Sequence, residues 1–360
     1  MNEQVSNPDF ISETVWRYFW FPVCTLEEFY AADPSGRGPL KVMLLGETLV
    51  IVELDEGIAA LGARCCHRSA SLALGFVDKG KLRCRYHGWA YNGKGHCVEI
   101  PACPDMEIPA VARIPQYETQ QAYGLVWVRL DASADTKIPL CPGFTDKNFK
   151  AVQIEPYEWQ TSAARRLENY VDLAHFPYVH PNTLFDPNIM SVTPPYIDRV
   201  DGQLVFYFEA PEDMPVPDVA LMGKTDYQIT IPFTVNAEFL LNTKTGKGNR
   251  AILWMSASPI DSKTCRVFSF TCRDHDKDKP DYPHVAFQEQ VLNEDKPVIE
   301  SQYPQEIPGP SQEISVQSDK VSIHYRKWLR QLAAAAEKGP SELMKCITSD
   351  AKDPTRKQLA

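Results

Sequence analysis

The chain has 360 residues, of which 44% are hydrophobic and 23% charged, a composition that excludes a disordered or fibrous protein and allows two domains of ordinary size. Asp and Glu outnumber Lys and Arg by 47 to 37, a formal net charge of −10, which disfavours nucleic acid and anionic membranes as partners. No apolar run approaches the ~18 residues of a membrane helix and no secretory signal begins the chain, so we expect a cytoplasmic protein without membrane contact.

The first part of the chain predicts a small antiparallel β domain. Between Lys41 and Arg129 the sequence alternates short β-forming runs with Gly and Asn, and no helical period of useful length occurs. The runs cover residues 42–45, 49–52, 58–61, 90–91 and 125–128. A connector with two prolines, Pro139 and Pro142, follows at 135–149. We therefore predict an N-terminal domain of residues 1–150, whose segment 1–40 packs on the domain that follows.

Ten cysteines are many for a chain expected in the reducing cytosol, and they favour metal sites or buried thiols over disulfides. Two of them begin short motifs, Cys65-Cys66-His67 and Cys84-Arg85-Tyr86-His87. The single residue inside the first motif suits one tetrahedral zinc ion poorly. It suits a two-iron cluster in which one iron takes sulfurs and the other takes imidazoles. Cys66 is expected to point away from Cys65 and is not counted as a ligand.

The remainder of the chain predicts a mixed α and β domain over residues 151–345. Helices are expected at 165–175, at 284–302 and around Trp328, and strands at 203–209 and 227–240, with two more inside 251–270. The sequence after Gly339 is polar, so we expect a loose end there and treat 346–360 as a tail. The predicted fold class is α+β.

Asn169, Asp172 and His175 follow one another at intervals of three, so a helix would place them along one face. His180 lies five residues beyond His175, and Pro177 between them is placed to bend the helix. A bent helix could direct both imidazoles at one point. Two histidines and a carboxylate form the facial triad of a non-haem Fe(II) oxygenase. The carboxylate must come from later in the chain, where the candidates are Glu289, Glu294, Asp295 and Glu300.

Together these motifs resemble those of the Rieske non-haem iron oxygenases. The pattern Cys-x-His and Cys-x2-His resembles the Rieske [2Fe–2S] signature, and Asn-x2-Asp-x2-His-x4-His resembles the family's mononuclear-iron segment. The resemblance extends from Trp16 to Trp328. It implies an all-β Rieske domain followed by a helix-grip-like α+β catalytic domain with an antiparallel sheet.

The resemblance also implies the roles of the site residues. One cluster iron takes Cys65 and Cys84, and the other takes His67 and His87. His175, His180 and Asp295, the last within a Glu-Asp-Lys segment like that of the family, bind the mononuclear Fe(II). Asp172 bridges electrons from a cluster histidine of the neighbouring subunit, and Asn169 supports the iron ligands. Gln302, two helical turns after Asp295, is expected to contact substrate.

A chain of this family is a terminal oxygenase. The sequence has no Gly-rich dinucleotide fingerprint, so electrons from NAD(P)H are expected through a separate reductase of the flavin or ferredoxin type. The resemblance requires a ring, a homotrimer or a hexamer, which could include a homologous subunit. The net acidic charge favours a reductase with a basic patch.

The substrate is expected to be an aromatic or heterocyclic small molecule. Several segments, among them 21–25, 100–104, 183–187, 211–214 and 294–302, are most similar to bacterial methylxanthine N-demethylases, monooxygenases that hydroxylate an N-methyl carbon and release formaldehyde. O-demethylation, another hydroxylation and ring dioxygenation stay open as alternatives. So do two interpretations from other classes, a Rieske electron-transfer protein without oxygenase activity and a zinc-stabilised binding module.

Overall fold

The computed structural model describes residues 13–181, 183–184, 196–209, 224–241 and 248–350. They form two compact units. The N-terminal unit is Arg17–Ile138, and the C-terminal unit contains the described residues of Met1–Trp16 and of Pro139–Ala360. The compared segments 185–187 and 211–214 lie outside the described residues.

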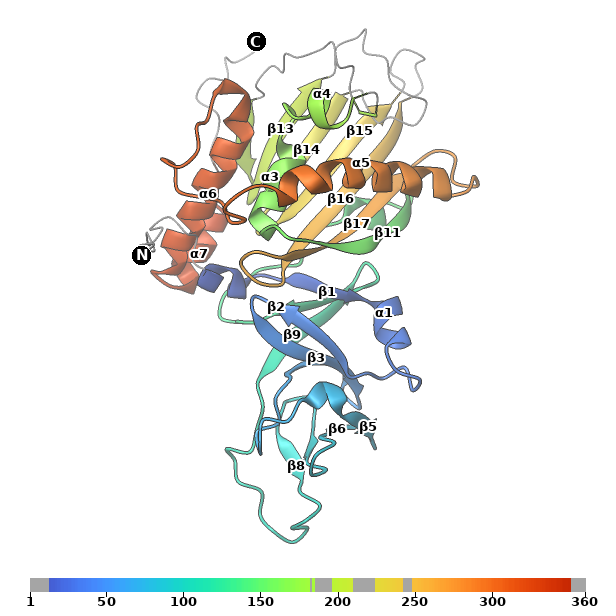
Figure 1. The fold of residues 1–360 in the computed structure, drawn as a ribbon, viewed down its shortest axis with the longest axis vertical. Coiled ribbons are helices and arrows are strands. Elements are labelled where there is room, and N and C mark those ends of the chain that lie inside the picture. The colour runs from blue at the N-terminus through green and yellow to red at the C-terminus, as the bar shows by residue number, and fades with distance from the viewer. Residues whose placement is uncertain (1–12, 182, 185–195, 210–223, 242–247, 351–360) are drawn as a thin grey trace. The chain divides into compact units, whose positions relative to one another are not determined.

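The N-terminal unit is built on an antiparallel six-stranded sheet (Figure 1). Its order is β1 (Phe21–Thr25), β10 (Leu125–Arg129), β9 (Gln116–Ala122), β4 (Gly57–Gly62), β3 (Glu47–Leu54) and β2 (Leu40–Leu44). Helix α1 (Leu26–Ala31) follows β1 and begins at a capping box of Thr25 and Glu28. Every residue of β10 is buried, which agrees with its uninterrupted apolar run.

A second sheet of this unit carries the two Cys/His motifs. It has the order β5 (Phe76–Asp78), β6 (Lys81–Arg83), β7 (Ala90–Tyr91) and β8 (Cys97–Glu99). The motif that starts at Cys65 lies between β4 and β5, and the motif that starts at Cys84 joins β6 to β7. Leu82 and Tyr91 lie in a hydrophobic core shared with Leu61 and Ile114. The hairpin that holds the second motif is therefore anchored by apolar packing against the rest of the unit.

The C-terminal unit is an antiparallel seven-stranded sheet with helices on one face (Figure 1). The order is β11 (Lys150–Trp159), β17 (Cys265–Arg273), β16 (Asn249–Pro259), β15 (Thr234–Leu241), β14 (Lys224–Thr230), β13 (Gln203–Glu209) and β12 (Ile197–Val200). Helices α3 (Ala163–Val171) and α5 (Tyr282–Glu300) lie across this sheet, and α4 (Phe176–Val179) is a single turn. Tyr227 and Leu253 both pair with Ala237 in register, so their side chains lie on one face of the sheet.

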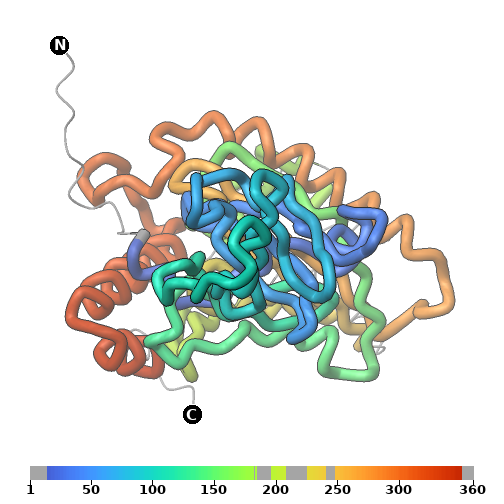
Figure 2. The backbone as a smooth tube through the Cα atoms, turned by 90° about the horizontal axis from the view of Figure 1, so that it is seen from below, coloured from blue at the N-terminus to red at the C-terminus, as the bar shows by residue number. Residues whose placement is uncertain are grey.

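The described residues of this unit form three further helices. Helix α2 (Pro142–Thr145) precedes β11, and α6 (Lys320–Ala336) and α7 (Pro340–Ile347) lie side by side in two views (Figures 1 and 2). Short 3-10 helices occur at Glu13–Tyr18, Leu72–Leu74 and Gln317–Asp319. In the part of the chain that the structure describes, no helix combines the length and apolarity needed to cross a bilayer.

The α+β fold class is confirmed, while several element boundaries were wrong. Helix α3 ends at Val171 rather than at His175, so Asp172 is its C-cap, and Pro177 lies in the first turn of α4 instead of bending one continuous helix. The expected strand at 227–240 is two strands, β14 and β15, separated by a turn at residues 231–233. Residues 340–347 are not loose, because they form α7, which buries Leu343. Its amphipathic pattern was hidden by its short length.

Candidate metal centres

Three side chains that are far apart in sequence converge at the C-terminal end of α3. His175, His180 and Asp295 each offer a ligand atom, and these atoms lie within 4.8 Å of one another. The Nε2 atoms of His175 and His180 are 3.4 Å and 3.1 Å from Asp295 Oδ1. Donors about 2.1 Å from one ion at roughly right angles lie about 3 Å apart, so these separations suit a shared metal ion.

The outer nitrogen of each histidine faces a second carboxylate. His180 Nδ1 is 2.8 Å from Glu294 Oε2, and His175 Nδ1 is 3.6 Å from Asp172 Oδ2. Thr183 donates to the other oxygen of Glu294 at 2.8 Å. A carboxylate on the outer nitrogen orients an imidazole and directs its free lone pair inward, as metal-bound histidines require.

The chain breaks between α3 and α4 so that both histidines can reach this point. Asp172 leaves the helical conformation, and its Oδ1 accepts the backbone N–H of Ala174 at 2.8 Å, which forms a tight turn. His175 then precedes α4 and His180 follows it, so the two residues bracket one helical turn. The bend expected at Pro177 is thus supplied by Asp172.

Electrostatics at the triad favour a cation. Burial raises the pKa of the Asp295 carboxyl, but the facing imidazoles of His175 and His180 and the charge of Arg166 together hold it well below its usual range. Burial lowers the pKa of His175, and Asp172 and Asp295 outweigh that effect and raise it to about 9. His180 Nε2 is buried and has no hydrogen-bond partner among the described residues. Such an orphaned nitrogen beside a carboxylate fits a metal ligand.

Asn169 and Arg166 support Asp295 from α3. Asn169 donates from Nδ2 to Asp295 Oδ1 at 3.2 Å, and its own carbonyl oxygen accepts a hydrogen bond from Arg166. Arg166 is 1% exposed, and its guanidinium lies over the rings of Trp159, Tyr157 and Tyr170. Asn169 therefore contacts Asp295 directly, as its predicted supporting role requires.

The other acids considered as a third ligand lie elsewhere. Glu300 accepts the backbone N–H of Gln160 at 2.8 Å and pairs with Lys296. Glu289 is exposed, and Glu294 contacts His180 from outside the triad. Consecutive helix positions are turned by about 100°, which separates Glu294 from Asp295.

In the N-terminal unit, the two Cys/His motifs form facing loops. The Cys65 and Cys84 side chains are hydrogen-bonded to each other, and the rings of His67 and His87 lie 4.7 Å apart. Each loop is closed by backbone bonds, from Ser69 N to Cys65 O at 3.0 Å and from Gly88 N to Cys84 O at 2.9 Å. The sulfurs therefore gather on one side and the imidazoles on the other.

Two details of these loops concern Gly88 and Cys66, and the second differs from expectation. Gly88 has a φ of 73°, and a Cβ there would meet Pro101 Cγ at 3.1 Å, so turn geometry already requires this glycine. Cys66 does not point away from Cys65, because both sulfurs contact the hydroxyl of Tyr91, at 3.3 Å and 2.9 Å. A turn, rather than an extended strand, follows Cys65, and side chains do not alternate there.

Comparison with known proteins identifies both units. The Rieske [2Fe-2S] domain family matches residues 19–118, and the vanillate O-demethylase oxygenase C-terminal domain family matches residues 159–335. Methylxanthine N3-demethylase NdmB of Pseudomonas putida is 45% identical over 94% of this chain and 95% of its own length. Methylxanthine N1-demethylase NdmA of the same organism is 44% identical over 90% of this chain and 91% of its own length.

The chain is a Rieske non-haem iron oxygenase. The structure of Pseudomonas putida CBB5 NdmA with caffeine superimposes with a TM-score of 0.90 and 41% identity, covering 96% of this chain and 99% of that one. Dicamba monooxygenase, at 20% identity and a TM-score of 0.72, shares the fold. Oxygenases of this family carry a [2Fe–2S] cluster and a mononuclear iron, act with a separate reductase and form oligomers.

The residues of this oxygenase fit both groups. Paired thiols opposite paired imidazoles match a Rieske cluster, and the Nδ1 atom of His67 is buried without a hydrogen-bond partner among the described residues. His67 also stacks on Trp89, with ring centroids 4.5 Å apart. The two histidines and Asp295 match a facial triad.

An aromatic pocket of the oxygenase opens on one side of the triad. It is lined by rings from α3, α4, the sheet and α5, namely Tyr170, Phe176, Tyr227, Phe239 and Phe287. Gln288 also lines it, is 5% exposed and has no hydrogen-bond partner among the described residues. Sequence reasoning missed Gln288, although it lies seven residues before Asp295 and therefore on the same helix face.

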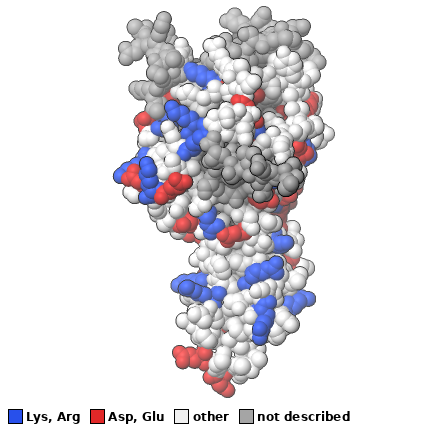
Figure 3. Space-filling view, turned by 60° about the vertical axis from the view of Figure 1, so that its left-hand side comes forward, with Lys and Arg blue, Asp and Glu red and all other residues white. Residues whose placement is uncertain are grey.

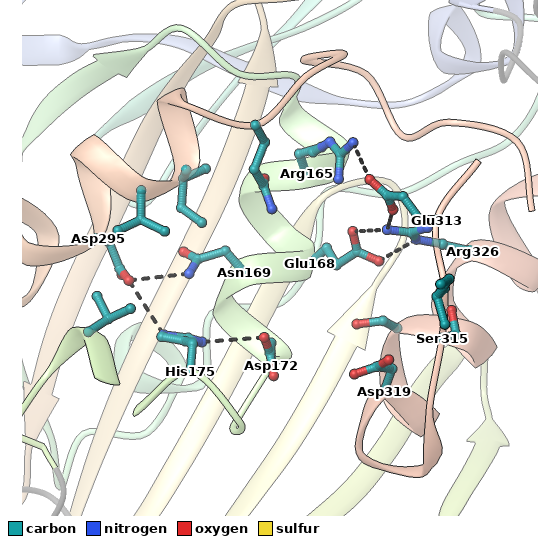
Figure 4. A pocket seen from close by; sticks show the side chains of 16 residues that line it. Arg165, Glu168, Asn169, Asp172, His175, Asp295, Glu313, Ser315, Asp319 and Arg326 are labelled. Carbon is teal, nitrogen blue, oxygen red and sulfur yellow. Dashed lines mark hydrogen bonds and ion pairs between the residues drawn. The ribbon is translucent and has the colours of Figure 1, made fainter. Parts of the chain in front are cut away.

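A polar cavity of about 450 Å³ also borders the triad (Figure 4). Asp172, His175 and Asp295 line it, together with the ion-pair network of Arg165, Glu313, Arg326 and Glu168. Gln302 lines this cavity and not the aromatic pocket. Its contact with substrate stays a prediction.

Proposed function

We propose that this oxygenase removes an N-methyl group from a methylxanthine-like heterocycle. The observation that carries the proposal is the aromatic pocket beside the triad, whose wall contains the Gln288 amide, unpaired within the described part of the chain. Aromatic rings suit the faces of a flat heterocycle. The amide can donate and accept, so it suits a ring edge that carries carbonyl and nitrogen atoms. Relatives named methylxanthine N1- and N3-demethylases, at 44% and 45% identity, support this substrate class.

The proposed reaction uses one O2, two electrons and two protons. One oxygen atom is inserted into a C–H bond of the N-methyl group, and the other leaves as water. The resulting N–CH2OH group breaks its C–N bond, which releases formaldehyde and leaves N–H on the heterocycle. When bound, the mononuclear iron supplies O2 activation, and the cluster supplies electrons one at a time.

The ligand assignment is part of the same proposal. Cys65 and Cys84 would bind one cluster iron, and His67 and His87 the other. His175, His180 and Asp295 would bind the mononuclear iron through the three atoms that lie within 4.8 Å. Asp172, Asn169 and Glu294 orient these ligands. Phe176 is placed between the two triad histidines in sequence and lines the pocket, so the substrate would be held directly beside the iron.

We propose that the oligomer is a homotrimer or a hexamer of two trimers and that Asp172 carries electrons between subunits. The Asp172 side chain is 37% exposed and lines the polar cavity, so a cluster histidine of a second copy could reach its carboxylate. An Asp172→Asn variant should keep both metal centres and lose about 10–100-fold in turnover. Unchanged turnover would exclude the bridging role.

The reductase partner is proposed to present an acidic surface. Arg64, Arg68 and Arg85 lie in or next to the two motif loops, are exposed and have no ion-pair partner among the described residues. Lys and Arg side chains predominate on the visible face of this unit (Figure 3). The local charge is therefore opposite to the net charge of −10 that favoured a basic partner. Arg68→Glu should raise the KM for the reductase, and Lys345→Glu on α7 should not.

A cytoplasmic location is part of the proposal. All ten cysteines are free, including the adjacent pair Cys141 and Cys272, which are both fully buried and hydrogen-bonded to each other. Free thiols in such proximity persist in a reducing compartment.

The test is a substrate assay with formaldehyde detection. The iron-loaded oxygenase, supplied with a compatible reductase, is offered methylxanthines and, in parallel, methoxyaromatics. We expect formaldehyde and the N-demethylated product from a methylxanthine. Formaldehyde from the methoxyaromatics alone would favour O-demethylation, and no substrate-dependent O2 uptake would favour the electron-transfer protein.

Substitution of Gln288 tests the pocket. Gln288→Leu keeps the side-chain size and removes the amide, so kcat/KM for a methylxanthine should fall about tenfold or more, the cost of a lost hydrogen bond of about 1.4 kcal/mol. Gln302→Leu is the informative comparison, because Gln302 lines the polar cavity. If Gln302→Leu raises KM and Gln288→Leu does not, the substrate binds in the polar cavity instead of the aromatic pocket.

A further inference from the structure

The hydroxyl of Tyr91 lies between two neighbouring sulfur atoms. It is 2.9 Å from Cys65 Sγ and 3.3 Å from Cys66 Sγ. Tyr91 is fully buried in the core of the N-terminal unit, on strand β7, whereas Cys66 is an exposed residue. The Cys66 sulfur, the Tyr91 hydroxyl oxygen and the Cys65 sulfur therefore form a chain of contacts. It runs from the protein surface to a sulfur assigned to the cluster.

The number of hydrogens that each group can donate decides which atom is the donor in each contact. A thiolate bound to iron can only accept a hydrogen bond, and a phenol has a single hydrogen to donate. The shorter contact is the one to Cys65, so the Tyr91 hydrogen points to Cys65 Sγ. The Tyr91 oxygen can still accept a hydrogen bond. The group within reach is the Cys66 thiol, whose S–H is a weak donor.

The two bonds reinforce each other. A hydroxyl that accepts a hydrogen bond becomes a stronger donor, and this polarisation is larger where water is excluded. Hydrogen bonds to cluster sulfurs stabilise the more negative, reduced state and raise the reduction potential. The Cys66 thiol thus acts on the cluster through Tyr91 without being a ligand.

We propose that Cys66 is a positioning residue that raises the reduction potential of the Rieske cluster through the hydrogen-bond chain Cys66 to Tyr91 to Cys65. This role rests on the ligand assignment under Proposed function. Cys66 occupies the middle position of the Cys-x-His pattern, where the pattern specifies no residue type. The loop supports the geometry, because Cys65 N donates to Ala70 O at 2.9 Å and Ser69 N donates to Cys65 O at 3.0 Å, which hold the Cys66 turn in place.

The experiment is a redox titration of the cluster in the intact, iron-loaded oxygenase, followed by visible absorption and by the EPR spectrum of the reduced cluster. Four proteins are compared with the wild type: Cys66→Ala, Tyr91→Phe, the double variant and Cys103→Ala. Cys103 is the matched control, since it is also exposed and in the same unit but makes no hydrogen bond to Tyr91 among the described residues.

Cys66→Ala should lower the potential, and Tyr91→Phe should lower it further. The double variant should match Tyr91→Phe, because Cys66 acts only through the hydroxyl, and Cys103→Ala should match the wild type. An unchanged or raised potential in Cys66→Ala overturns the proposal, and so does an equal effect of Cys66→Ala when Tyr91 is already Phe. Loss of the cluster from Cys66→Ala also overturns it, since Cys66 would then be a ligand. A wild-type protein that holds no cluster contradicts the ligand assignment instead.

Discussion

His175 and His180 have the same arrangement although they occupy different positions along the chain. Each turns Nε2 toward Asp295 and Nδ1 toward an outer carboxylate, Asp172 in one case and Glu294 in the other. The outer carboxylates differ in access to solvent, with side chains 37% exposed for Asp172 and 26% for Glu294. Asp172 also lines the polar cavity, whereas Glu294 does not, so Asp172 can meet a group that enters from outside.

Removal of one triad histidine should affect the mononuclear iron site and leave the cluster site unchanged. In His175→Ala we expect the iron content to fall from about three to about two per chain, with two acid-labile sulfides retained, because the mononuclear site loses a ligand and the cluster does not. Turnover should be lost while the visible spectrum of the cluster is kept. His284→Ala, on α5 outside both sites, is the control. Loss of cluster absorption in His175→Ala would contradict the division into two sites.

Iron binding by the metal-free protein should depend on pH through His175. Asp172 and Asp295 raise the pKa of His175 to about 9, so the ring is protonated at neutral pH and must release its proton to bind a metal. The apparent affinity for Fe(II) should therefore rise about tenfold per pH unit from about pH 7 and level off near pH 9. Anaerobic titrations at several pH values measure this slope.

The same shift has a consequence for stability. Because the pKa of folded His175 lies above its unfolded value, the protonated ring stabilises the metal-free fold below about pH 6.5, and that contribution is lost as the pH rises through about 9. Asp172→Asn removes one of the groups that raise this pKa, so the levelling of iron affinity should move to lower pH. An unchanged profile would mean that Asp172 does not govern the proton on His175.

At the scale of elements, helix α3 is held by charges rather than by apolar packing alone. Arg326 on α6 donates to Glu168 on α3 from Nε at 2.5 Å and from Nη2 at 2.7 Å, and Nη2 also reaches Glu313 at 2.7 Å. Arg165 on α3 donates to Glu313 at 2.8 Å (Figure 4). Burial raises the pKa of Glu168 in spite of Arg326. These bonds fix the helix end from which the iron-binding segment departs.

Breaking this network should destabilise the C-terminal unit. Arg326→Met leaves Glu168, which is 8% exposed, without its counter-charge, and the free energy of unfolding should fall by about 3–5 kcal/mol. Lys345→Met breaks the exposed pair with Glu342 on α7 and should cost about 0–1 kcal/mol. Denaturant unfolding of the metal-free proteins compares them. Equal losses would show that the α3–α6 pairs are no stronger than surface pairs.

At the scale of the whole molecule, the chain contains both an electron-accepting unit and an oxygen-activating unit, and the proposed electron path crosses between copies. A Cys84→Ser variant should lack the cluster, and a His175→Ala variant should lack the mononuclear iron, so each is inactive alone. Co-assembled oligomers should regain turnover, because an intact cluster of one copy then serves an intact iron site of another. The measurement is formaldehyde production by mixed oligomers purified with two different tags. Mixed oligomers without turnover would contradict transfer between subunits.

The sequence alone determined the family and the α+β class, and it predicted the residue types of both candidate metal centres, because ligand chemistry requires particular side chains at short spacings. Cys65 with His67, and Cys84 with His87, are local motifs, and a local turn suffices to present each pair. Strand β13 and helix α6 were also predictable, since each buries a regular apolar pattern.

Only the tertiary structure decided the contacts made by residues distant in sequence. The end of α3 at Val171 depends on the turn that Asp172 makes, and the choice between Glu294 and Asp295 depends on how α5 is rotated against α4. The polar cavity beside Gln302 and the hydroxyl of Tyr91 between two sulfurs have no local signature. Periodicity fixes which face of an element is buried, whereas the partner of that face is set by packing across the whole unit.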